Sequence, residues 1–403
     1  MRMQDNGSLR ICVLGNAWSP HIQNRTRILA EMGHTVTLLS ADTADIPGVV
    51  VRRISPSIKL PFCGWSILFS YRQAIQSLEP DAIHVHYASG FHAWVNLLLP
   101  QLPFIVSLMG RDILFEEQGN PTAASKRLTL DTLEQAASIT SKSAYINDYL
   151  KGVAPGALEK TEIIRWGIDP EQFRPMDARV LRQKLGIDAD APVILCPRGF
   201  APIYNIDTLL RAFANVRKQV TNAMLVLFEF HQDGGYRKYM DSIIDELGLK
   251  DNVIILGDIA HADMPLYYNI ADVVVSIPSS DGMPQSLFEA LACQSAMIIS
   301  DLPHYREIVE DQKEVCMTPV SVEAVTDAIL SLLKDAPARL RLGEAGRRMV
   351  LAKANFNEDA RRVETLLVRA GKSRGARKPY SRLRMAGLLF LHYAEAVFTG
   401  KEK

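Results

Sequence analysis

Short apolar runs alternate with amphipathic, helix-length segments along most of this chain, and the alternation forms two separate series. The runs lie at residues 10–15, 35–40, 81–86 and 104–108, and again at 193–199, 224–230, 253–256, 272–277 and 296–300. Strands of parallel sheets are buried on both faces, so they appear as continuous apolar runs, and helices connect them. We therefore predict an α/β fold with two doubly wound domains.

The stretch between the two series, residues 167–192, is rich in proline and aspartate and contains no buried strand. A chain of 403 residues is also too long for one ordinary core. We predict a first domain at residues 1–175, a second at 176–355, and a crossing helix with a C-terminal extension at 356–403. Ligands of such sheets bind outside the carboxyl ends of the strands, so we expect a site in an interdomain cleft.

The charge balance is even, with 45 Lys and Arg against 45 Asp and Glu, and gives no support for nucleic-acid binding. Five cysteines are scattered without CxxC spacing, as is typical of reduced thiols in the cytoplasm. The N-terminal segment lacks the architecture of a signal peptide, and no apolar run approaches the ~18 residues that span a bilayer. We therefore expect a cytoplasmic location.

Two carboxylates lie close together in the second series. Asp281 lies in a turn rich in Pro and Gly after the apolar run 272–277, and Glu289 lies on the opening turns of a predicted helix. A strand, a tight turn and a helix N-terminus bind anions, because the first backbone N–H groups of the helix have no internal partners. Carboxylates instead suit sugar and ribose hydroxyls, which donate to a charged acceptor. The combination predicts a nucleotide-sugar site.

Several segments resemble the retaining glycosyltransferases of family 4 (glycosyl transferases group 1). The acidic pair resembles the family's acidic-x7-Glu motif. The other matching segments are residues 81–87, 110–113, 164–175, 196–199 and 269–279, and the resemblance covers about residues 10–370. It implies the GT-B fold, with two Rossmann-like domains that face a cleft. The acceptor would bind on the first domain and the nucleotide sugar on the second.

The resemblance also implies roles for three residues. Glu289 would accept hydrogen bonds from ribose hydroxyls, Asp281 would hold hydroxyls of the donor sugar, and Arg198 would pair with the diphosphate. A planar guanidinium binds phosphate oxygens bidentately and stabilises the charge of the leaving group. The family retains the anomeric configuration, with the departing phosphate helping to deprotonate the acceptor. We expect no protein nucleophile, no metal, and no cofactor apart from the nucleoside diphosphate sugar as donor substrate.

Further site residues are predicted around these three. The donor side is expected to include Gly199, Tyr204, Asn205, Gly257, Ile259, Gly282, Met283, Pro284, Gln285 and Ser286. The acceptor side is expected to include Trp18, His21, His86 and Asp112. Trp18 and His21 follow the first predicted strand, where a loop of the first domain would meet the acceptor.

The sequence departs from the family pattern at several positions. Asp281 is one methylene shorter than the usual glutamate. Tyr204 stands where the family has a lysine, so half of the diphosphate clamp is absent unless Tyr204 or Asn205 donates a hydrogen bond instead. Met109 replaces a histidine, and residues 16–21 replace a Gly-Gly pair. These departures keep a non-catalytic nucleotide-sugar-binding protein open as an alternative.

Some of these residues also have simpler interpretations. Acidic residues near a helix N-terminus also complement the helix dipole, and Arg198 could form an ordinary surface ion pair. His84, His86 and His92 could suggest a metal site, but packing in the sheet is the favoured interpretation. The Asp-Ala-Asp sequence at 188–190 lies in a linker. We therefore predict no metal site.

The C-terminal region combines basic and apolar residues. Residues 372–384 contain Lys and Arg but no acid, and an apolar, helix-like segment follows at 385–398. Such a region either lies on an anionic membrane surface or packs back on the first domain. Residues 372–403 are therefore a candidate membrane contact, which would place the protein at the inner face of a membrane.

The expected function is that of a retaining, metal-independent glycosyltransferase. It would move a sugar from a nucleoside diphosphate donor to a hydroxyl of a carbohydrate or lipid-linked acceptor, in polysaccharide, lipopolysaccharide or glycolipid synthesis. A sugar-nucleotide 2-epimerase of the same fold is the alternative from another enzyme class.

Overall fold

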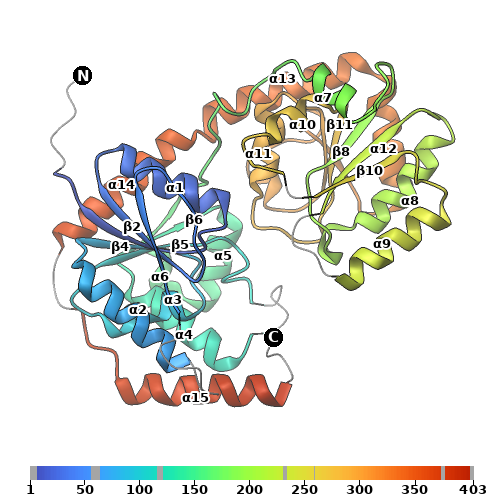
Figure 1. The fold of residues 1–403 in the computed structure, drawn as a ribbon. Helices are drawn as coiled ribbons and strands as arrows, with labels where there is room; N and C mark the ends of the chain where they lie inside the picture. Colours follow the sequence, from blue (N-terminus) through green and yellow to red (C-terminus); the bar gives the residue numbers. More distant parts are fainter. Residues whose placement is uncertain are drawn as a thin grey trace. The chain divides into compact units, whose positions relative to one another are not determined.

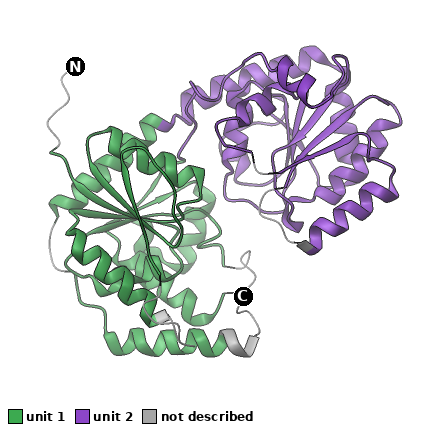
Figure 2. Cartoon of the chain, viewed as in Figure 1, with its two compact units in different colours: residues 1–165, 357–403 green, residues 166–356 purple. Residues whose placement is uncertain are grey.

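The computed structural model describes residues 7–55, 64–115, 121–229, 234–257, 259–373 and 377–399. The chain forms two compact units, one of residues 1–165 with 357–403 and one of residues 166–356 (Figure 2). Each unit has a parallel β-sheet with helices packed on it (Figure 1). Every apolar run that was predicted as a strand contains one, which confirms the α/β architecture with two doubly wound domains.

The sheet described in the first unit has seven parallel strands in the order β3-β2-β1-β4-β5-β6-β7. They are β1 (Arg10–Leu14), β2 (Thr35–Ser40), β3 (Val49–Arg53), β4 (Ala82–His86), β5 (Phe104–Ser107), β6 (Ser138–Ser141) and β7 (Thr161–Ile163). The helices are α1 (Pro20–Glu31), α2 (Gly64–Leu78), α3 (Phe91–Trp94), α4 (Ala123–Gln135), α5 (Ala144–Val153), α6 (Pro155–Leu158), α14 (Phe356–Lys372) and α15 (Arg382–Thr399), with a 3₁₀ turn at Val95–Leu98. Gly33 follows α1 with φ +94°, a conformation that suits glycine at a helix end.

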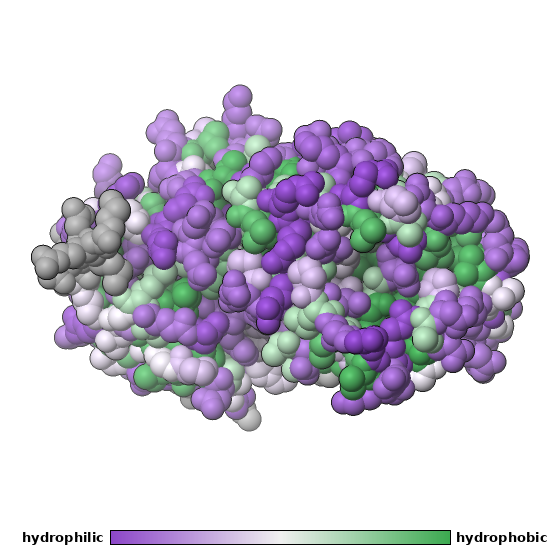
Figure 3. Space-filling view, turned by 90° about the horizontal axis from the view of Figure 1, so that it is seen from above, coloured by the Kyte–Doolittle hydropathy of each residue, from purple (hydrophilic) through white to green (hydrophobic). Residues whose placement is uncertain are grey.

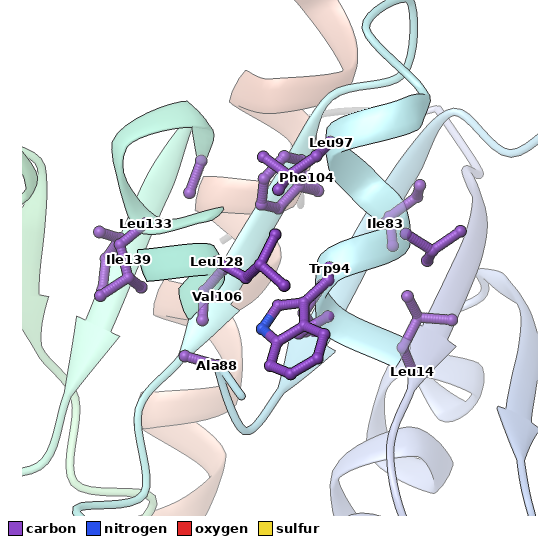
Figure 4. Packing of buried hydrophobic residues seen from close by; sticks show 14 of the residues in the cluster. Leu14, Ile83, Ala88, Trp94, Leu97, Phe104, Val106, Leu128, Leu133 and Ile139 are labelled. Carbon is purple, nitrogen blue, oxygen red and sulfur yellow. The ribbon is translucent and has the colours of Figure 1, made fainter. Parts of the chain in front are cut away.

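The core of the first unit lies between its sheet and its helices. Trp94 is 2% exposed and packs among buried residues of the sheet such as Ile83, Phe104 and Val106 (Figure 4). The same cluster includes Met385 and Leu389 of α15, so this C-terminal helix is part of the core. In the view of Figure 3, hydrophilic residues cover most of the visible surface, and hydrophobic residues form small separate groups.

The sheet described in the second unit has six parallel strands in the order β10-β9-β8-β11-β12-β13. They are β8 (Val193–Cys196), β9 (Met224–Phe228), β10 (Val253–Leu256), β11 (Val273–Ser276), β12 (Met297–Ser300) and β13 (Cys316–Thr318). The helices are α7 (Arg179–Lys184), α8 (Ile206–Arg217), α9 (Gly234–Glu246), α10 (Met264–Ile270), α11 (Gln285–Ala292), α12 (Val322–Lys334) and α13 (Ala336–Lys353), with 3₁₀ turns at Pro202–Tyr204 and Tyr305–Glu307. The strand order reverses between β8 and β11, and ligands of doubly wound sheets bind at this kind of reversal.

The boundary between the units falls at Arg165/Trp166, whereas the sequence suggested 175/176. The reason is that the segment after Arg165 pairs with the end of α13. The N–H of Ile168 donates to the carbonyl of Ala354 at 2.9 Å, and Phe173 is buried in the core of the second unit. The C-terminal boundary is close to the expected one, because residues 357–403 return to the first unit through α14 and α15.

Candidate active site

The predicted donor residues gather where the strand order of the second unit reverses. Arg198 follows β8, and the turn that contains Asp281 follows the neighbouring strand β11. Helix α11, which carries Glu289, begins directly after this turn. Because the carboxyl ends of parallel strands meet at one edge of a sheet, two loops far apart in sequence are brought together here.

Arg198 and Asp281 form an ion pair, and both side chains are 11% exposed. Nη1 of Arg198 also donates to Oγ of Ser286 at 3.2 Å. Burial by itself would lower the pKa of Arg198, but the neighbouring Asp281 raises the pKa above its ordinary value, so the guanidinium stays charged. Within the described residues, its buried Nε–H has no hydrogen-bond partner. A guanidinium held beside a helix N-terminus is suited to an anionic ligand.

The loop that contains Tyr204 and Asn205 supports this arginine. The ring of Tyr204 lies against the guanidinium, with 4.2 Å between the ring centroid and Cζ of Arg198. Asn205 adopts a left-handed backbone with φ +52°, and its Nδ2 donates to the carbonyl of Ile277 at 2.8 Å and to Oγ of Ser279 at 2.9 Å. Both amide hydrogens of Asn205 therefore fasten the loop to the turn after β11.

Glu289 is 4% exposed, and its two carboxylate oxygens have different partners. The hydroxyl of Tyr268 donates to Oε2 at 2.8 Å, and Nε2 of His261 lies 2.8 Å from Oε1. Burial raises the pKa of Tyr268 well above its usual range, and the nearby Glu289 raises it further. Sequence reasoning missed both partners. His261 lies in a loop and Tyr268 in an apolar helix, where neither differs from an ordinary solvated or core residue.

The turn before α11 is tightly shaped. Met283 is 1% exposed and has φ +74°, and Gly282 donates its N–H to Oδ1 of Asp281 at 2.7 Å. Pro284 is the N-cap of α11, and the side-chain amide of Gln285 donates to the carbonyl of Trp166. The backbone N–H groups at the start of α11 therefore lie beside the Arg198–Asp281 pair, while the Gln285 side chain fixes the segment after Arg165.

The remaining donor-side residues lie at the same edge of the sheet. Gly199 is buried directly after Arg198. Gly257 follows β10, and Ile259 packs against the core of the second unit, while residue 258 between them lies outside the described part of the chain. Their contact with a nucleobase stays a prediction.

The acceptor-side candidates lie in the first unit and differ in exposure. Trp18 is 71% exposed, and His21 is half-buried. Asp112 is buried and accepts hydrogen bonds from the N–H groups of Ala88, Met109 and Gly110 at 2.7–2.9 Å, so it ties two loops together. Burial raises the pKa of Asp112, although these hydrogen bonds oppose the rise. A direct acceptor contact stays a prediction for Trp18 and His21.

His86 is 2% exposed, and its ring lies tilted against that of His84, with 4.0 Å between the ring centroids. Nε2 of His84 lies 2.8 Å from Oγ of Ser107, and Nε2 of His92 donates to the carbonyl oxygens of His86 and Tyr87 at 3.1 Å. Burial lowers the pKa of His84 to about 3 and that of His86 well below its usual range. The imidazoles are therefore neutral, and their positions in and beside β4 agree with packing in the sheet.

Two family models match this chain. The model "Glycosyl transferases group 1" matches residues 177–349, and the model "Glycosyl transferase 4-like" matches residues 10–143. The two matches therefore fall in different units, and the first includes Arg198, Asp281 and Glu289.

Curated relatives that match this chain are named as sugar transferases. One is the GDP-mannose-dependent alpha-(1-6)-phosphatidylinositol monomannoside mannosyltransferase of Mycobacterium tuberculosis, with 26% identity over 223 residues. This match covers 53% of the present chain and 57% of the relative, so the chain spans little more than half of that protein's length. Another is the D-inositol 3-phosphate glycosyltransferase of Segniliparus rotundus, with 26% identity over 366 residues, 81% of this chain and 78% of the relative.

Solved structures share the fold. Sucrose-phosphate synthase from Thermosynechococcus elongatus has a TM-score of 0.77 at 21% identity, covering 89% of this chain and 98% of that one. Anabaena HepE in complex with UDP-glucose has a TM-score of 0.77 at 17% identity, covering 89% of this chain and 99% of that one. These structures show the GT-B fold, and the two family models show that the chain belongs to the group 1 glycosyltransferases.

Proposed function

We propose that this protein transfers a sugar from a nucleoside diphosphate sugar to a hydroxyl group of a carbohydrate or lipid-linked acceptor. The observation that carries the proposal is the group of Arg198, Asp281 and Ser286 beside the start of α11, with Glu289 on the same helix. It combines a cation and helix N–H groups for a diphosphate with carboxylates for hydroxyl groups. The second unit would thus be the donor-binding domain and the first the acceptor-side domain.

In this proposal Arg198 stabilises the negative charge on the diphosphate as the sugar leaves. Asp281 and the backbone N–H groups of residues 282, 283 and 285 hold the sugar hydroxyls, and Glu289 holds the ribose. The departing phosphate would receive the acceptor proton, in a reaction that retains the anomeric configuration and uses no metal. In support, the Asp281 and Glu289 carboxylates are held by the side chains of Arg198, Tyr268 and His261, which positions them as hydrogen-bond acceptors and not as nucleophiles.

We place the reaction in polysaccharide, lipopolysaccharide or glycolipid synthesis, at the cytoplasmic face of a membrane. Support for a lipid-linked acceptor comes from the name of the mycobacterial relative, which acts on a phosphatidylinositol mannoside. None of the helices in the described part of the chain is long and apolar enough to cross a bilayer. Any membrane contact of these helices would therefore be at the surface.

Helix α15 provides such a surface. Its side chains at i, i+7 and i+8, namely Leu383, Phe390 and Leu391, are 86%, 65% and 49% exposed and form one outward stripe. The exposed cations Lys378 and Arg382 lie next to its N-terminal end. Apolar side chains beside cations complement a bilayer with anionic headgroups, and we propose that this stripe rests on one.

The donor site is tested by isothermal titration calorimetry with UDP, GDP, ADP and their sugars. Wild type is expected to bind one nucleotide, and Glu289→Ala should weaken that binding by about ten- to hundredfold, because hydrogen bonds to a charged group contribute ~1.5–3 kcal/mol. Glu344→Ala is the matched control, since this glutamate is exposed on α13 and pairs with Arg348. Failure of the wild type to bind any of these ligands would overturn the proposal.

A further inference from the structure

The carboxylate of Glu289 is held by two side chains that lie before α11 in the sequence. Tyr268 is on α10, and His261 is in the loop between β10 and α10. Each contacts a different oxygen at 2.8 Å, so both oxygens of the carboxylate are held in place. The helix that carries Glu289 also packs beside α10, which brings these residues together.

Tyr268 is well suited to hold one oxygen in place. Tyr268 is 1% exposed, and its ring packs against that of Phe173, with 6.3 Å between the ring centroids. Its backbone carbonyl accepts a hydrogen bond from Oγ of Ser295 at 3.2 Å. The phenol therefore has a fixed position, and its proton is directed to Oε2 of Glu289.

His261 differs from Tyr268 in its exposure. Its side chain is 18% exposed, whereas that of Glu289 is 5% exposed. The imidazole packs against Phe173, with 5.3 Å between the ring centroids. Phe173 thus contacts both rings that hold the glutamate.

Glu289 needs these donors because a buried carboxylate is costly unless it is hydrogen-bonded. An ionised carboxylate has about four acceptor positions, so these two donors leave further positions for other hydroxyl groups. Their effect is to select one orientation of the carboxylate. A ligand that binds the remaining positions does not have to immobilise the side chain itself.

We propose that Tyr268 and His261 are positioning residues that orient Glu289 toward the ribose hydroxyls of the nucleotide. The inference rests on the proposed donor site, which it deepens by naming the two side chains that orient Glu289 for ribose binding. Neither residue contacts the reacting atoms. Both act through the glutamate, so their effect on binding depends on the ribose hydroxyl groups.

That dependence gives a test by calorimetry. Binding of the nucleoside diphosphate that wild type selects from UDP, GDP and ADP is compared with binding of its 2′,3′-dideoxy counterpart. Tyr268→Phe, which removes only the hydroxyl, should weaken binding of the ribonucleotide by roughly tenfold. It should change the affinity for the dideoxy nucleotide by less than about twofold, because the hydroxyls that Glu289 would hold are missing from that ligand. His261→Ala should behave in the same way, and His261→Gln, which keeps a side-chain N–H, should restore part of the binding.

Tyr267→Phe is the matched control and should leave both affinities unchanged. This neighbouring tyrosine packs against Phe228, with 5.3 Å between the ring centroids. Equal weakening of the two nucleotides by Tyr268→Phe and by the His261 variants would overturn the inference, because it would indicate only a structural role. So would a wild type that binds both nucleotides equally well, although nucleotide binding itself would then stand. A wild type that binds neither would overturn the proposed function as well.

Discussion

At the scale of single residues, the sequence predicts which side chains gather beside the start of α11 better than it predicts their contacts. Arg198, Asp281 and Ser286 were expected on the donor side, and the structure brings them together. Tyr204 and Asn205 were considered as replacement donors to phosphate. A phosphate contact of Tyr204 stays a prediction, while its ring lies against Arg198 and the amide of Asn205 donates to the turn after β11. These contacts depend on a left-handed backbone and on neighbouring strands, which sequence does not show.

The Tyr204 contact leads to a prediction for diphosphate binding. Tyr204→Ala should weaken binding of the nucleoside diphosphate by about two- to thirtyfold, because a cation–π contact contributes ~0.5–2 kcal/mol and holds the guanidinium in place. Tyr204→Phe should bind like wild type, because it keeps the ring that lies against Arg198. Calorimetry of both variants decides the matter. Equal losses in the two variants would mean that the hydroxyl, not the ring, is the important group.

At the scale of secondary-structure elements, buried apolar strands were predictable and polar strands were not. The runs at β1, β8 and β11 are four or five residues long and almost entirely buried, so their pattern is clear. β6 has the sequence SITS, and β7 has three residues of intermediate burial. Such strands are recognised only by their neighbours in the sheet, since their own side chains carry little hydrophobic signal.

The position of α11 depends on its packing against α13, which the sequence pattern did not indicate. A Cβ at Gly343 of α13 would lie 2.2 Å from the carbonyl oxygen of Gln294, just beyond the end of α11. This distance is far below van der Waals contact, and the obstacle is backbone. Glycine at this position therefore permits the close approach that fixes the helix carrying Glu289.

Gly343→Ala is therefore expected to destabilise the protein. The added methyl group should cost about 1–3 kcal/mol through overpacking and lower the melting temperature in calorimetry. Gly387→Ala on α15 is the control, because nothing lies within 4 Å of its Cβ. That change should stabilise the helix by roughly 0.5–1 kcal/mol. The same sign for both substitutions would contradict the close approach of α11 and α13.

At the scale of the whole molecule, the sequence left two roles open for the C-terminal region, and the structure divides the region between two faces. Two of its arginines form contacts within the first unit. The Arg377 guanidinium lies 4.5 Å from the ring centroid of Phe104 and donates to backbone carbonyls, and Arg384 pairs with Asp131 at 3.1 Å. Met385 and Leu389 are buried in the core, beside α4 (Figure 1). The outward face of α15 has its own apolar stripe. Neither the charges nor the hydropathy of the sequence distinguishes the apolar residues of this face from those of the packed face.

This division determines how membrane association should be tested. Removing α15 would uncover the core around Met385 and Leu389, so a truncated chain would confuse loss of stability with loss of lipid contact. A double substitution on the outward face, Leu383→Glu with Phe390→Glu, leaves the packed face intact. Two buried apolar side chains contribute about 1.5–3 kcal/mol each, and each nearby cation adds ~1 kcal/mol on an anionic surface.

In flotation assays, wild type should therefore rise with vesicles that contain phosphatidylserine and remain below with phosphatidylcholine alone, and added salt should weaken the association. The double variant should not float under any of these conditions. Leu340→Glu, at a 62% exposed position on α13 in the second unit, is the control and should float like wild type. Flotation of the double variant at the wild-type level would show that the stripe on α15 is not the lipid contact. Failure of the wild type itself to float would exclude a membrane-bound protein, and the acceptor would then be sought among water-soluble carbohydrates.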